Sequence, residues 1–333
     1  MKRTAVIAIG GNSLTLPGQA GTVEEQRENV RQTCESVADI LAAGYHVVIT
    51  HGNGPQVGAA LLKSELASRE VPPVTLDVCD AETQATIGYM IQQTLGGVLE
   101  ARRMPRPVAT VITQVVVDPK DPAFQTPTKP IGPFLGRGEA EQHRLDRGWS
   151  VVEDAGRGWR RVVASPQPLE IVELDAIRRC LINGVAVIAV GGGGIPVVRG
   201  EHGLRGIEAV IDKDRASGLL AAHLRADLLM ISTSIDRLAI HFGKPNQQFL
   251  SELTLDDARR YLAEGHFPAG SMGPKIEAAI FYLERGGKQV IITSPDHLQH
   301  ALEGKAGTSI RPTPRGSRGI PKAEPVAKPR ALG

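Results

Sequence analysis

Three segments of the chain place a glycine-rich turn directly after an apolar strand. They are TAVIAIGGN (residues 4–12), HVVITHGNGP (46–55) and AVIAVGGGGIPVV (186–198). Glycine lets the backbone turn sharply and present its N–H groups to a ligand, and the carboxyl edge of an open α/β sheet is where ligands bind. One such turn is most simply a tight loop, but three of them predict a site for an anionic phosphate. None matches the P-loop pattern or the dinucleotide-binding fingerprint.

Lysine side chains are the charged donors that best fit such an anion. Lys213 lies in the run VIDKD at the predicted end of a strand, Lys275 follows a Gly-Pro pair at a helix start, and Lys129 lies in the proline-rich run TKPIGPF. Phosphoryl transfer depends more on charge neutralisation and in-line positioning than on covalent chemistry. Any one lysine could instead be a solvated surface residue, which is the default interpretation for Lys63 and Lys305.

No side chain stands out as a general base. His51 follows an apolar strand and precedes Gly52, but we interpret it as a hydrogen-bonded structural histidine, and His241 and His266 likewise. The sequence also contains no cluster of metal-ligating residues. We therefore predict no metal site built by the protein alone.

The rest of the chain predicts a sheet whose strands share one carboxyl edge. Strand-like and helix-like segments alternate over residues 4–305, which is typical of a doubly wound α/β sandwich with a mostly parallel sheet. Thr22, with Glu25 three residues later, is a capping-box signal for a helix over residues 23–43. Further helices are predicted over residues 56–68, 80–102, 169–183, 215–224, 255–264, 276–285 and 295–302. Further strands are predicted over residues 107–117, 227–232, 235–242 and 289–293.

The segment 118–166 interrupts this alternation. It is dense in proline and contains two strand-like runs, 149–153 and 159–164, joined by DAGRG, which is a hairpin signal. We expect a small protruding subdomain over the sheet edge that acts as a lid, with Lys129 at its functional tip. The alternative is a surface excursion without a role.

Composition narrows the class of protein. The 333 residues, 41% of them hydrophobic, allow one large α/β domain or two lobes, and no run is long and apolar enough to span a membrane. Three scattered cysteines favour a reducing cytoplasm over a disulfide framework or a zinc site. The first strand begins by Thr4, which leaves no room for a signal peptide.

Charge is distributed unevenly along the chain. The net charge is +2, but residues 311–333 carry +5, so the remainder carries −3. The body has no nucleic-acid-binding signature, and we predict neither a nucleic-acid nor a membrane partner. The tail, residues 311–333, is rich in proline, glycine and basic residues and is predicted to be disordered. A tethering arm for nucleic acid or membrane is the less favoured alternative.

Taken together, these motifs resemble the carbamate kinases of the amino acid kinase family. The resemblance covers the whole chain short of the tail, in the family's order. The matching segments are IAIGGNSL (7–14), THGNGPQVG (50–58), PTKPIGPF (127–134), GWSVVEDAGRGWRRVVASP (148–166), AVGGGGIPV (189–197), VIDKDRAS (210–217), FGKPNQ (242–247), GHFPAGSMGPK (265–275) and GTSI (307–310).

The resemblance implies a three-layer α/β/α sandwich, the amino acid kinase fold, over residues 1–310. The part up to about residue 185 would hold the acid substrate and carry the lid, and residues 186–310 would hold the nucleotide. It also implies reversible phosphoryl transfer between ATP and carbamate, run toward ATP from ADP and carbamoyl phosphate in catabolism of arginine. A cytoplasmic homodimer is expected, with Mg²⁺ arriving with ATP or ADP.

The resemblance also implies roles for individual residues. Lys213 and Lys275 would contact nucleotide phosphates, and Lys129 would reach the transferred group from the lid. Asp214 would orient the lysines and keep them charged, although it could be only the N-cap of the next helix. Carbamate is already an anion, so no base is needed. Substrate and phosphate contacts are expected from Gly10, Gly11, Asn12, Gly52, Asn53 and Gly54. Nucleotide contacts are expected from Gly191, Gly192, Ser234, Phe242, Gly243, Met272 and Gly273.

Two other functions remain open at the level of sequence. One is a kinase of the same family that acts on a different carboxylate or phosphate acceptor, against which the run TKPIGPF argues. The other is a non-catalytic nucleotide-binding regulator, which loss of the three lysines or of Asp214 would favour; all four residues are present.

Overall fold

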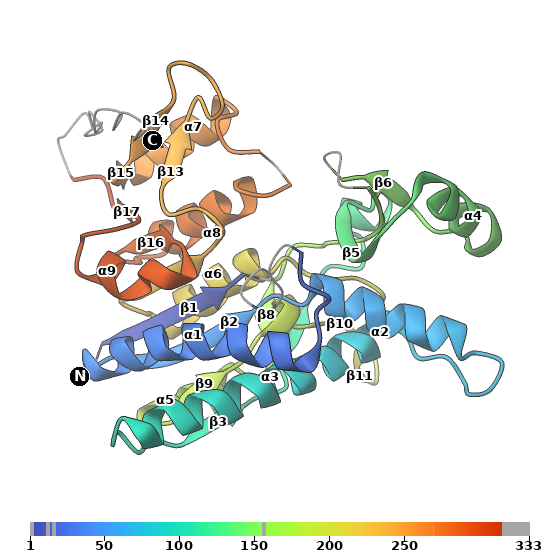
Figure 1. Ribbon diagram of the computed structural model, residues 1–333, viewed down its shortest axis with the longest axis horizontal. Coiled ribbons are helices and arrows are strands. Elements are labelled where there is room, and N and C mark those ends of the chain that lie inside the picture. The colour runs from blue at the N-terminus through green and yellow to red at the C-terminus, as the bar shows by residue number, and fades with distance from the viewer. Residues whose placement is uncertain (1–2, 11–13, 15–17, 155–157, 269, 315–333) are drawn as a thin grey trace, which may run out of the picture.

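In the part of the chain that the structure describes, eight strands form a mostly parallel central sheet (Figure 1). The computed structural model describes residues 3–10, 14, 18–154, 158–268 and 270–314. The strands lie in the order β15-β17-β16-β12-β1-β2-β9-β3. Their bounds are β1 Thr4–Ile9, β2 His46–His51, β3 Val108–Thr110, β9 Ala186–Ile188, β12 Leu228–Ser232, β15 Glu252–Thr254, β16 Val290–Thr293 and β17 Thr308–Arg311.

The sheet is parallel except where β16 and β17 pair in antiparallel fashion. Helices cover both faces, so the strands are apolar almost without alternation, and β1 is buried from Ala5 to Ile9. Along β1, Ala5 and Ile7 face one helix layer, and Val6 and Ala8 face the other. The prediction that these apolar runs form buried strands of a parallel sheet is confirmed.

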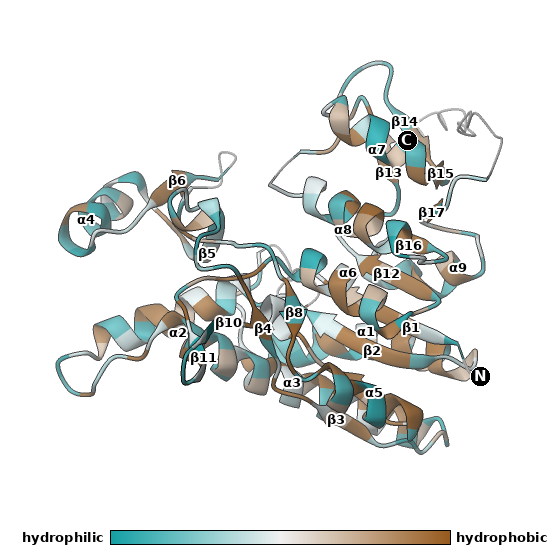
Figure 2. Ribbon diagram, turned by 180° about the vertical axis from the view of Figure 1, so that it is seen from behind, coloured by the Kyte–Doolittle hydropathy of each residue, from teal (hydrophilic) through white to brown (hydrophobic). Residues whose placement is uncertain are grey.

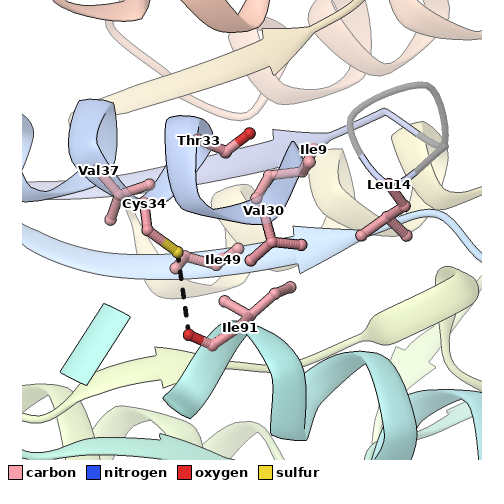
Figure 3. Close-up of a pocket in the computed structure, with 8 residues that line it drawn as sticks. All are labelled: Ile9, Leu14, Val30, Thr33, Cys34, Val37, Ile49 and Ile91. Atoms are coloured by element: carbon pink, nitrogen blue, oxygen red, sulfur yellow. Dashed lines mark hydrogen bonds between the residues drawn. The ribbon is translucent and has the colours of Figure 1, made fainter. Parts of the chain in front are cut away.

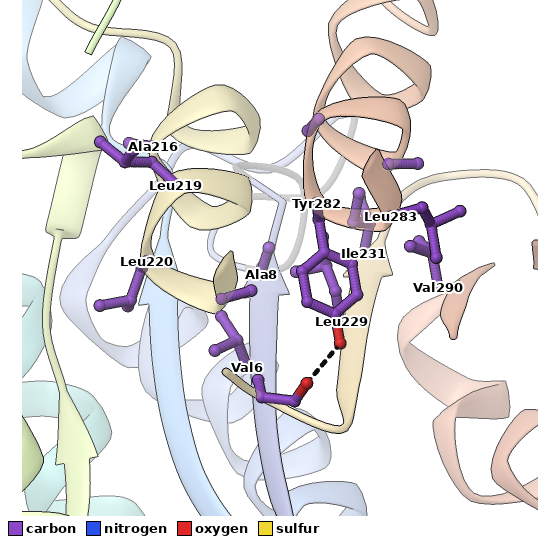
Figure 4. Close-up of a cluster of buried hydrophobic side chains, with 14 of the residues drawn as sticks. Val6, Ala8, Ala216, Leu219, Leu220, Leu229, Ile231, Tyr282, Leu283 and Val290 are labelled. Atoms are coloured by element: carbon purple, nitrogen blue, oxygen red, sulfur yellow. Dashed lines mark hydrogen bonds between the residues drawn. The ribbon is translucent and has the colours of Figure 1, made fainter. Parts of the chain in front are cut away.

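Two layers of helices enclose the sheet, as the strand and helix alternation predicts. One layer consists of α1 Val23–Ala42, α3 Leu76–Ala101 and α9 Leu298–Leu302. The other consists of α5 Leu174–Ile182, α6 Lys213–Leu224 and α8 Gly273–Glu284, with α7 Leu255–Ala263 packed against α8. In Figure 2 the strands of the central sheet are mostly brown, whereas the helices carry both teal and brown residues. In the second layer the hydroxyl of Tyr282 donates to Ala226 O at 2.6 Å (Figure 4).

A small gap remains in the first layer, between α1, α3, β1 and β2 (Figure 3). Its lining is apolar except for Thr33, and Cys34 Sγ lies 3.9 Å from Ile91 O. Burial raises the pKa of the Cys34 thiol to about 12. The gap has no room for a water molecule, so it is a packing feature and not a ligand site.

Smaller sheets lie outside the central one. A four-stranded sheet in the order β11-β10-β4-β8 comprises β4 Gln114–Val116, β8 Glu170–Ile171, β10 Ile195–Gly200 and β11 Gly203–Gly206. A two-stranded ribbon pairs β13 Leu238–Ile240 with β14 Gln248–Leu250. Short 3₁₀ turns occupy η2 Pro122–Phe124, η3 Gly191–Gly193 and η4 Pro295–His297.

The insertion protrudes from the body beside α2 (Gly54–Leu66), as Figure 1 shows. The predicted hairpin is present as β6 (Val151–Glu153) and β7 (Trp159–Val163). The sequence did not predict β5 (Lys129–Leu135) or α4 (Arg137–Arg147), because proline and glycine interrupt the first and charged residues dominate the second. Glu65 of α2 ties the insertion down through ion pairs with Arg147 at 2.9 Å and Arg161 at 2.7 Å.

Several sequence predictions are wrong in detail. The predicted strand 107–117 is two strands, β3 and β4, which belong to different sheets, and the run 186–198 likewise divides into β9 and β10. The predicted strand 235–242 shortens to β13, and the predicted helix 169–183 begins as β8. The runs 107–117 and 186–198 each contribute to two sheets, which periodicity alone cannot distinguish. The capping box of Thr22 and Glu25 is confirmed.

The body extends beyond the predicted boundary at residue 310. Arg311 belongs to β17, and Thr313 Oγ1 accepts a hydrogen bond from Asp256 N at 3.1 Å. Residues 315–333 of the predicted tail lie outside the described residues. None of the helices described combines the length and apolar character needed to cross a lipid bilayer.

We predict that Gly58→Ala displaces the insertion. A Cβ at Gly58 would lie 2.0 Å from Gly132 N, where the backbones of α2 and β5 touch. The variant should lose thermal stability and turnover, because β5 begins with Lys129. Gly97→Ala is the control: no atom beyond its chain neighbours and the adjacent backbone of α3 lies within 4 Å of that Cβ, and it should stabilise α3 by about 0.5–1 kcal/mol. Equal melting temperatures for the two variants would contradict this packing.

Candidate active site

The glycine-rich turns meet at the carboxyl edge of the central sheet. Because β1, β2 and β9 are parallel neighbours, the turns that follow them leave on the same side. The imidazole of His51 and the carboxamide of Asn53 pack directly on the α-carbons of Gly191 and Gly192. The structure thus brings together the second and third turns, and Gly10 at the end of β1 lies against Ser232 O of β12. Gly11 and Asn12 lie outside the described residues.

Helix α6 begins at this edge with the run Asp212-Lys213-Asp214. Asp212 is the N-cap, and its carboxylate accepts from the backbone N–H of Asp214 at 2.9 Å and of Arg215 at 3.3 Å. The alternative role of Asp214 as N-cap is therefore wrong. Lys213 is also not at the end of a strand; it is the first residue of α6. The hydroxyls of Thr50 and Ser217, 2.6 Å apart, fix α6 against β2.

Asp214 holds two of the predicted lysines. Lys213 Nζ donates to Oδ1 at 2.6 Å and Lys275 Nζ donates to Oδ2 at 2.9 Å. Lys275 lies in the first turn of α8, which packs against α6 so closely that a Cβ at Gly218 would lie 2.9 Å from Ala278 O. The two helix starts thus bring both ammonium groups to one carboxylate.

The third lysine reaches the same place from the insertion. Lys129 Nζ donates to Asp212 Oδ2 at 2.6 Å, across 83 residues of sequence. The next residue, Pro130, has its carbonyl oxygen 3.6 Å from the Cβ position of Gly54. We call Lys129, Lys213 and Lys275 with Asp212 and Asp214 the lysine centre. Asp212 is not among the residues predicted from the sequence, because both Asp212 and Asp214 are possible N-cap residues before this helix.

The electrostatics of the lysine centre favour charged groups despite their burial. Burial opposes ionisation of Asp214, but Lys213 and Lys275 outweigh it and hold the pKa of that carboxyl below its usual range. Burial likewise opposes ionisation of Asp212, and Lys129 outweighs it, so the pKa of Asp212 is also lowered. Burial lowers the pKa of Lys213 despite Asp214, whereas Asp214 raises the pKa of Lys275 despite burial. Three ammonium groups on two carboxylates leave one positive charge, which suits an anion.

His51 is poorly suited to act as a general base. Its Nδ1 lies 3.1 Å from Gly52 O, so that nitrogen carries the hydrogen of the neutral ring. Burial lowers the pKa of His51 to about 4, although the hydrogen bond to Gly52 works the other way. The interpretation of His51 as a structural histidine agrees with this geometry.

The residues assigned to the nucleotide are more scattered. Gly273 and Met272 begin α8 beside Lys275. Ser234 is exposed after β12, and Phe242, 70% exposed, and Gly243 lie on the loop after β13, at the end of the molecule that carries α7 (Figure 1). The hydrogen bond of His241 N with His266 Nδ1 joins this loop to the segment before α8. The nucleotide roles of these residues stay predictions.

Within the described residues, no group of three His, Cys, Asp or Glu side chains is arranged to hold a metal ion. The two carboxylates of the lysine centre, Asp212 and Asp214, already form ion pairs with lysines.

A family profile, curated proteins and a solved structure that resemble this chain all point to one family. The profile of the amino acid kinase family matches residues 3–294. A carbamate kinase of Thermococcus kodakarensis is 51% identical over 313 residues, which are 93% of this chain and 99% of that protein. A carbamate kinase-like protein of Escherichia coli is 49% identical, over 93% of this chain and 99% of its own. The carbamate kinase from Giardia lamblia bound to AMP-PNP superposes with a TM-score of 0.86 at 45% identity, covering 94% of this chain and 99% of that one.

We predict that Asp214→Asn slows turnover strongly and makes it pH-dependent. The change is nearly isosteric, but it removes the charge that opposes the effect of burial on Lys213. The pKa of Lys213 should fall further, so the variant should recover activity as the pH is lowered and the ammonium reforms. Steady-state rates between pH 6 and 9 measure this.

Glu277→Gln is the matched control, since Glu277 pairs Arg215 between the same two helices at 2.7 Å without touching the lysine centre. The control should behave as wild type. An Asp214→Asn rate close to wild type at every pH would refute the orienting role.

We predict that His51 makes the fold acid-sensitive. The unfolded chain protonates this histidine below pH 6.5, but the folded protein does so only near pH 4, so stability is lost as the pH falls between those values. The loss due to His51 from pH 7.5 to 4.5 should be about 2.5 kcal/mol. His51→Asn, whose amide can still donate to Gly52 O, should lose that much less in urea unfolding. His202→Asn, on the surface, should follow wild type; equal losses in all three proteins would contradict this assignment.

Proposed function

The chain belongs to the amino acid kinase family, and from that premise we propose that it is a carbamate kinase, which transfers a phosphoryl group reversibly between ATP and carbamate. The observation that carries the proposal is the lysine centre, where three ammonium groups from three separate elements share two carboxylates. Phosphoryl transfer requires this concentration of positive charge without a covalent nucleophile. The names of the Thermococcus kodakarensis and Escherichia coli relatives support carbamate as the acceptor.

Lys213 and Lys275 serve the nucleotide side in this proposal. Both stand in the first turn of a helix, where backbone N–H groups add to the attraction for phosphate oxygens. Asp214 holds the two ammonium groups in place before the nucleotide arrives, so their orientation is not lost between turnovers. Mg²⁺ arriving with the nucleotide would be held mainly by phosphate oxygens and water and would further neutralise the phosphate charge.

Lys129 serves the transferred group. In the free protein its ammonium pairs with Asp212, and its side chain is 25% exposed, compared with 10% for Lys213 and 15% for Lys275. A phosphoryl group between the turns and α6 would take up the ammonium of Lys129, because charge on that group is spread over its oxygens in the transition state. Since Lys129 begins β5, the position of the whole insertion sets where this ammonium lies.

The acid substrate meets the glycine-rich turns. Carbamate is an anion at neutral pH and needs no base, which agrees with the low pKa of His51. The N–H of Gly52 already donates to Ile9 O at 3.1 Å, so the donors proposed for carbamate are the N–H groups of Gly54 and of the start of α2. We further propose that ADP and carbamoyl phosphate are the usual reactants, with ATP and carbamate as products of arginine catabolism, in a cytoplasmic homodimer. The reducing environment suggested by three unpaired cysteines supports that location.

A coupled assay for ATP formed from carbamoyl phosphate and Mg-ADP tests the proposal. Carbamoyl phosphate should support ATP formation, and acetyl phosphate and acyl phosphates of larger acids should support it poorly. Efficient turnover of another acyl phosphate with none of carbamoyl phosphate would favour a different acceptor. No turnover with any of them, together with tight ADP binding, would favour a non-catalytic regulator.

We predict that Lys129→Ala lowers kcat by about 10²–10³, the usual cost of removing one preorganised charge from a transition state. ADP affinity by calorimetry should change little, because Lys213 and Lys275 remain. Lys120→Ala, an exposed lysine of the same insertion, is the control and should be as active as wild type. The two tryptophans, Trp149 and Trp159, both lie in the insertion, so their fluorescence reports whether it stays folded. A kcat within about threefold of wild type would make Lys129 a surface residue instead.

A further inference from the structure

One face of α3 carries three buried polar side chains beneath the glycine-rich turns. They are Asp80, Thr83 and Gln84, spaced so that they share a helix face, and none is more than 3% exposed. Gln84 Nε2 donates to Gly191 O at 3.0 Å and supports the turn after β9. Asp80 and Thr83 instead support the turn after β2, where Asn53 lies.

Asn53 occupies the N-cap position of α2 but does not cap it. Within the described residues its side chain makes no hydrogen bond to the first turn of α2, although asparagine is among the best capping residues. Its amide nitrogen points the other way and donates to Asp80 Oδ1 at 2.8 Å and to Thr83 Oγ1 at 2.9 Å. Both hydrogens of the amide are thereby used.

The consequence lies at the start of α2. The first N–H groups of a helix have no partner within the helix, and a capping side chain would occupy one of them. The groups concerned are the N–H groups of Gly54 and Gln56, because Pro55 has no N–H and Val57 N donates to Asn53 O at 2.8 Å. With Asn53 turned toward α3, its side chain occupies neither of them, and Gly54 lies close to Pro130, which follows Lys129. They are the groups that the proposed function gives to the acid substrate.

Burial of the Asp80 carboxyl at this position lowers the stability of the folded protein. It is 1% exposed, and its Oδ2 has no hydrogen-bond partner among the described residues. Burial raises the pKa of the Asp80 carboxyl well above its usual range, although the hydrogen bond from Asn53 works the other way. An apolar side chain of the same size would avoid this penalty, so the carboxyl is not explained by stability.

We propose that Asp80 is a positioning residue that acts through Asn53: it holds the Asn53 side chain off the N-terminus of α2 and so leaves that end of the helix free to bind the acid substrate. The proposal rests on the proposed function for the identity of the substrate, but the contact itself does not depend on it.

Two variants of nearly equal size separate positioning from packing. Asp80→Asn keeps an oxygen acceptor for Asn53 in a neutral group, whereas Asp80→Leu removes the acceptor. In Asp80→Leu, Asn53 can turn and cap α2, so the KM for carbamoyl phosphate should rise about tenfold, the equivalent of one buried hydrogen bond. The same variant should unfold at an equal or higher temperature than wild type. Asp80→Asn should keep KM within about twofold, as should the surface control Glu82→Gln on the same helix.

A double-mutant cycle with Asn53→Ala locates the effect. If Asp80 acts through Asn53, replacing Asp80 by Leu should add nothing to the KM of Asn53→Ala. ADP affinity by calorimetry should be unchanged throughout. Equal KM values for Asp80→Leu and Asp80→Asn, or a full further increase in the Asn53→Ala background, would overturn the proposal.

Two further measurements keep the test decisive. Should Asp80→Leu fail to fold, Thr83→Val removes the other acceptor at nearly constant shape and is judged by the same comparison. Should wild type form no ATP from carbamoyl phosphate, the proposed function is wrong. Calorimetry with inorganic phosphate then decides on Asp80: weaker binding to Asp80→Leu than to Asp80→Asn supports its positioning role, and equal binding overturns it.

Discussion

The ion pairs of Asp212 and Asp214 with three lysines are the interaction on which the site depends. A buried ammonium or carboxylate alone is expensive, and only pairing makes these charges tolerable at the edge of an apolar sheet. Asp214 can hold both Lys213 and Lys275 because each carboxylate oxygen takes one ammonium. Asp212 caps α6 with one oxygen and holds Lys129 with the other. The surplus of one positive charge is what an incoming phosphate would find.

The fold serves to bring these five side chains together. Close packing of α6 on α8 sets the distance between Lys213 and Lys275. The contact of α2 with β5 sets the position of Lys129 relative to the start of α6. The parallel strands β1, β2 and β9 deliver their turns to the same edge. A methyl group added between Gly58 and Gly132, away from the lysine centre, should therefore affect turnover by displacing Lys129. The polar face of α3 likewise positions Asn53, through its hydrogen bonds to Asp80 and Thr83.

The sequence predicted the parts of this arrangement that depend on local patterns. Continuous apolar runs ending in glycine predicted the buried parallel strands and their shared edge, and Thr22 with Glu25 predicted the start of α1. The family resemblance supplied Lys129, Lys213, Lys275 and Asp214, and the structure brings all four into one cluster.

The parts that were missed depend on long-range contacts. Nothing local distinguishes Asp212 from Asp214 as the cap of α6, because either could precede the helix; the contact with Lys129, 83 residues away, accompanies the choice. Asp80 resembles any acidic residue on a helix until its burial beneath Asn53 is known. The strand predicted over residues 107–117 failed because its two halves pair with different partners, β9 and β10.

A crystal structure with Mg-ADP, carbamate and aluminium fluoride, a mimic of the transferring phosphoryl group, tests the central claim most directly. The account predicts that the ammonium groups of Lys129, Lys213 and Lys275 converge on the nucleotide phosphates and the fluoride, at hydrogen-bond distances of about 3 Å. It also predicts that Lys129 has left Asp212 while Asp214 still holds Lys213 and Lys275. A structure in which the fluoride lies away from these lysines, with Lys129 still paired to Asp212, would contradict it.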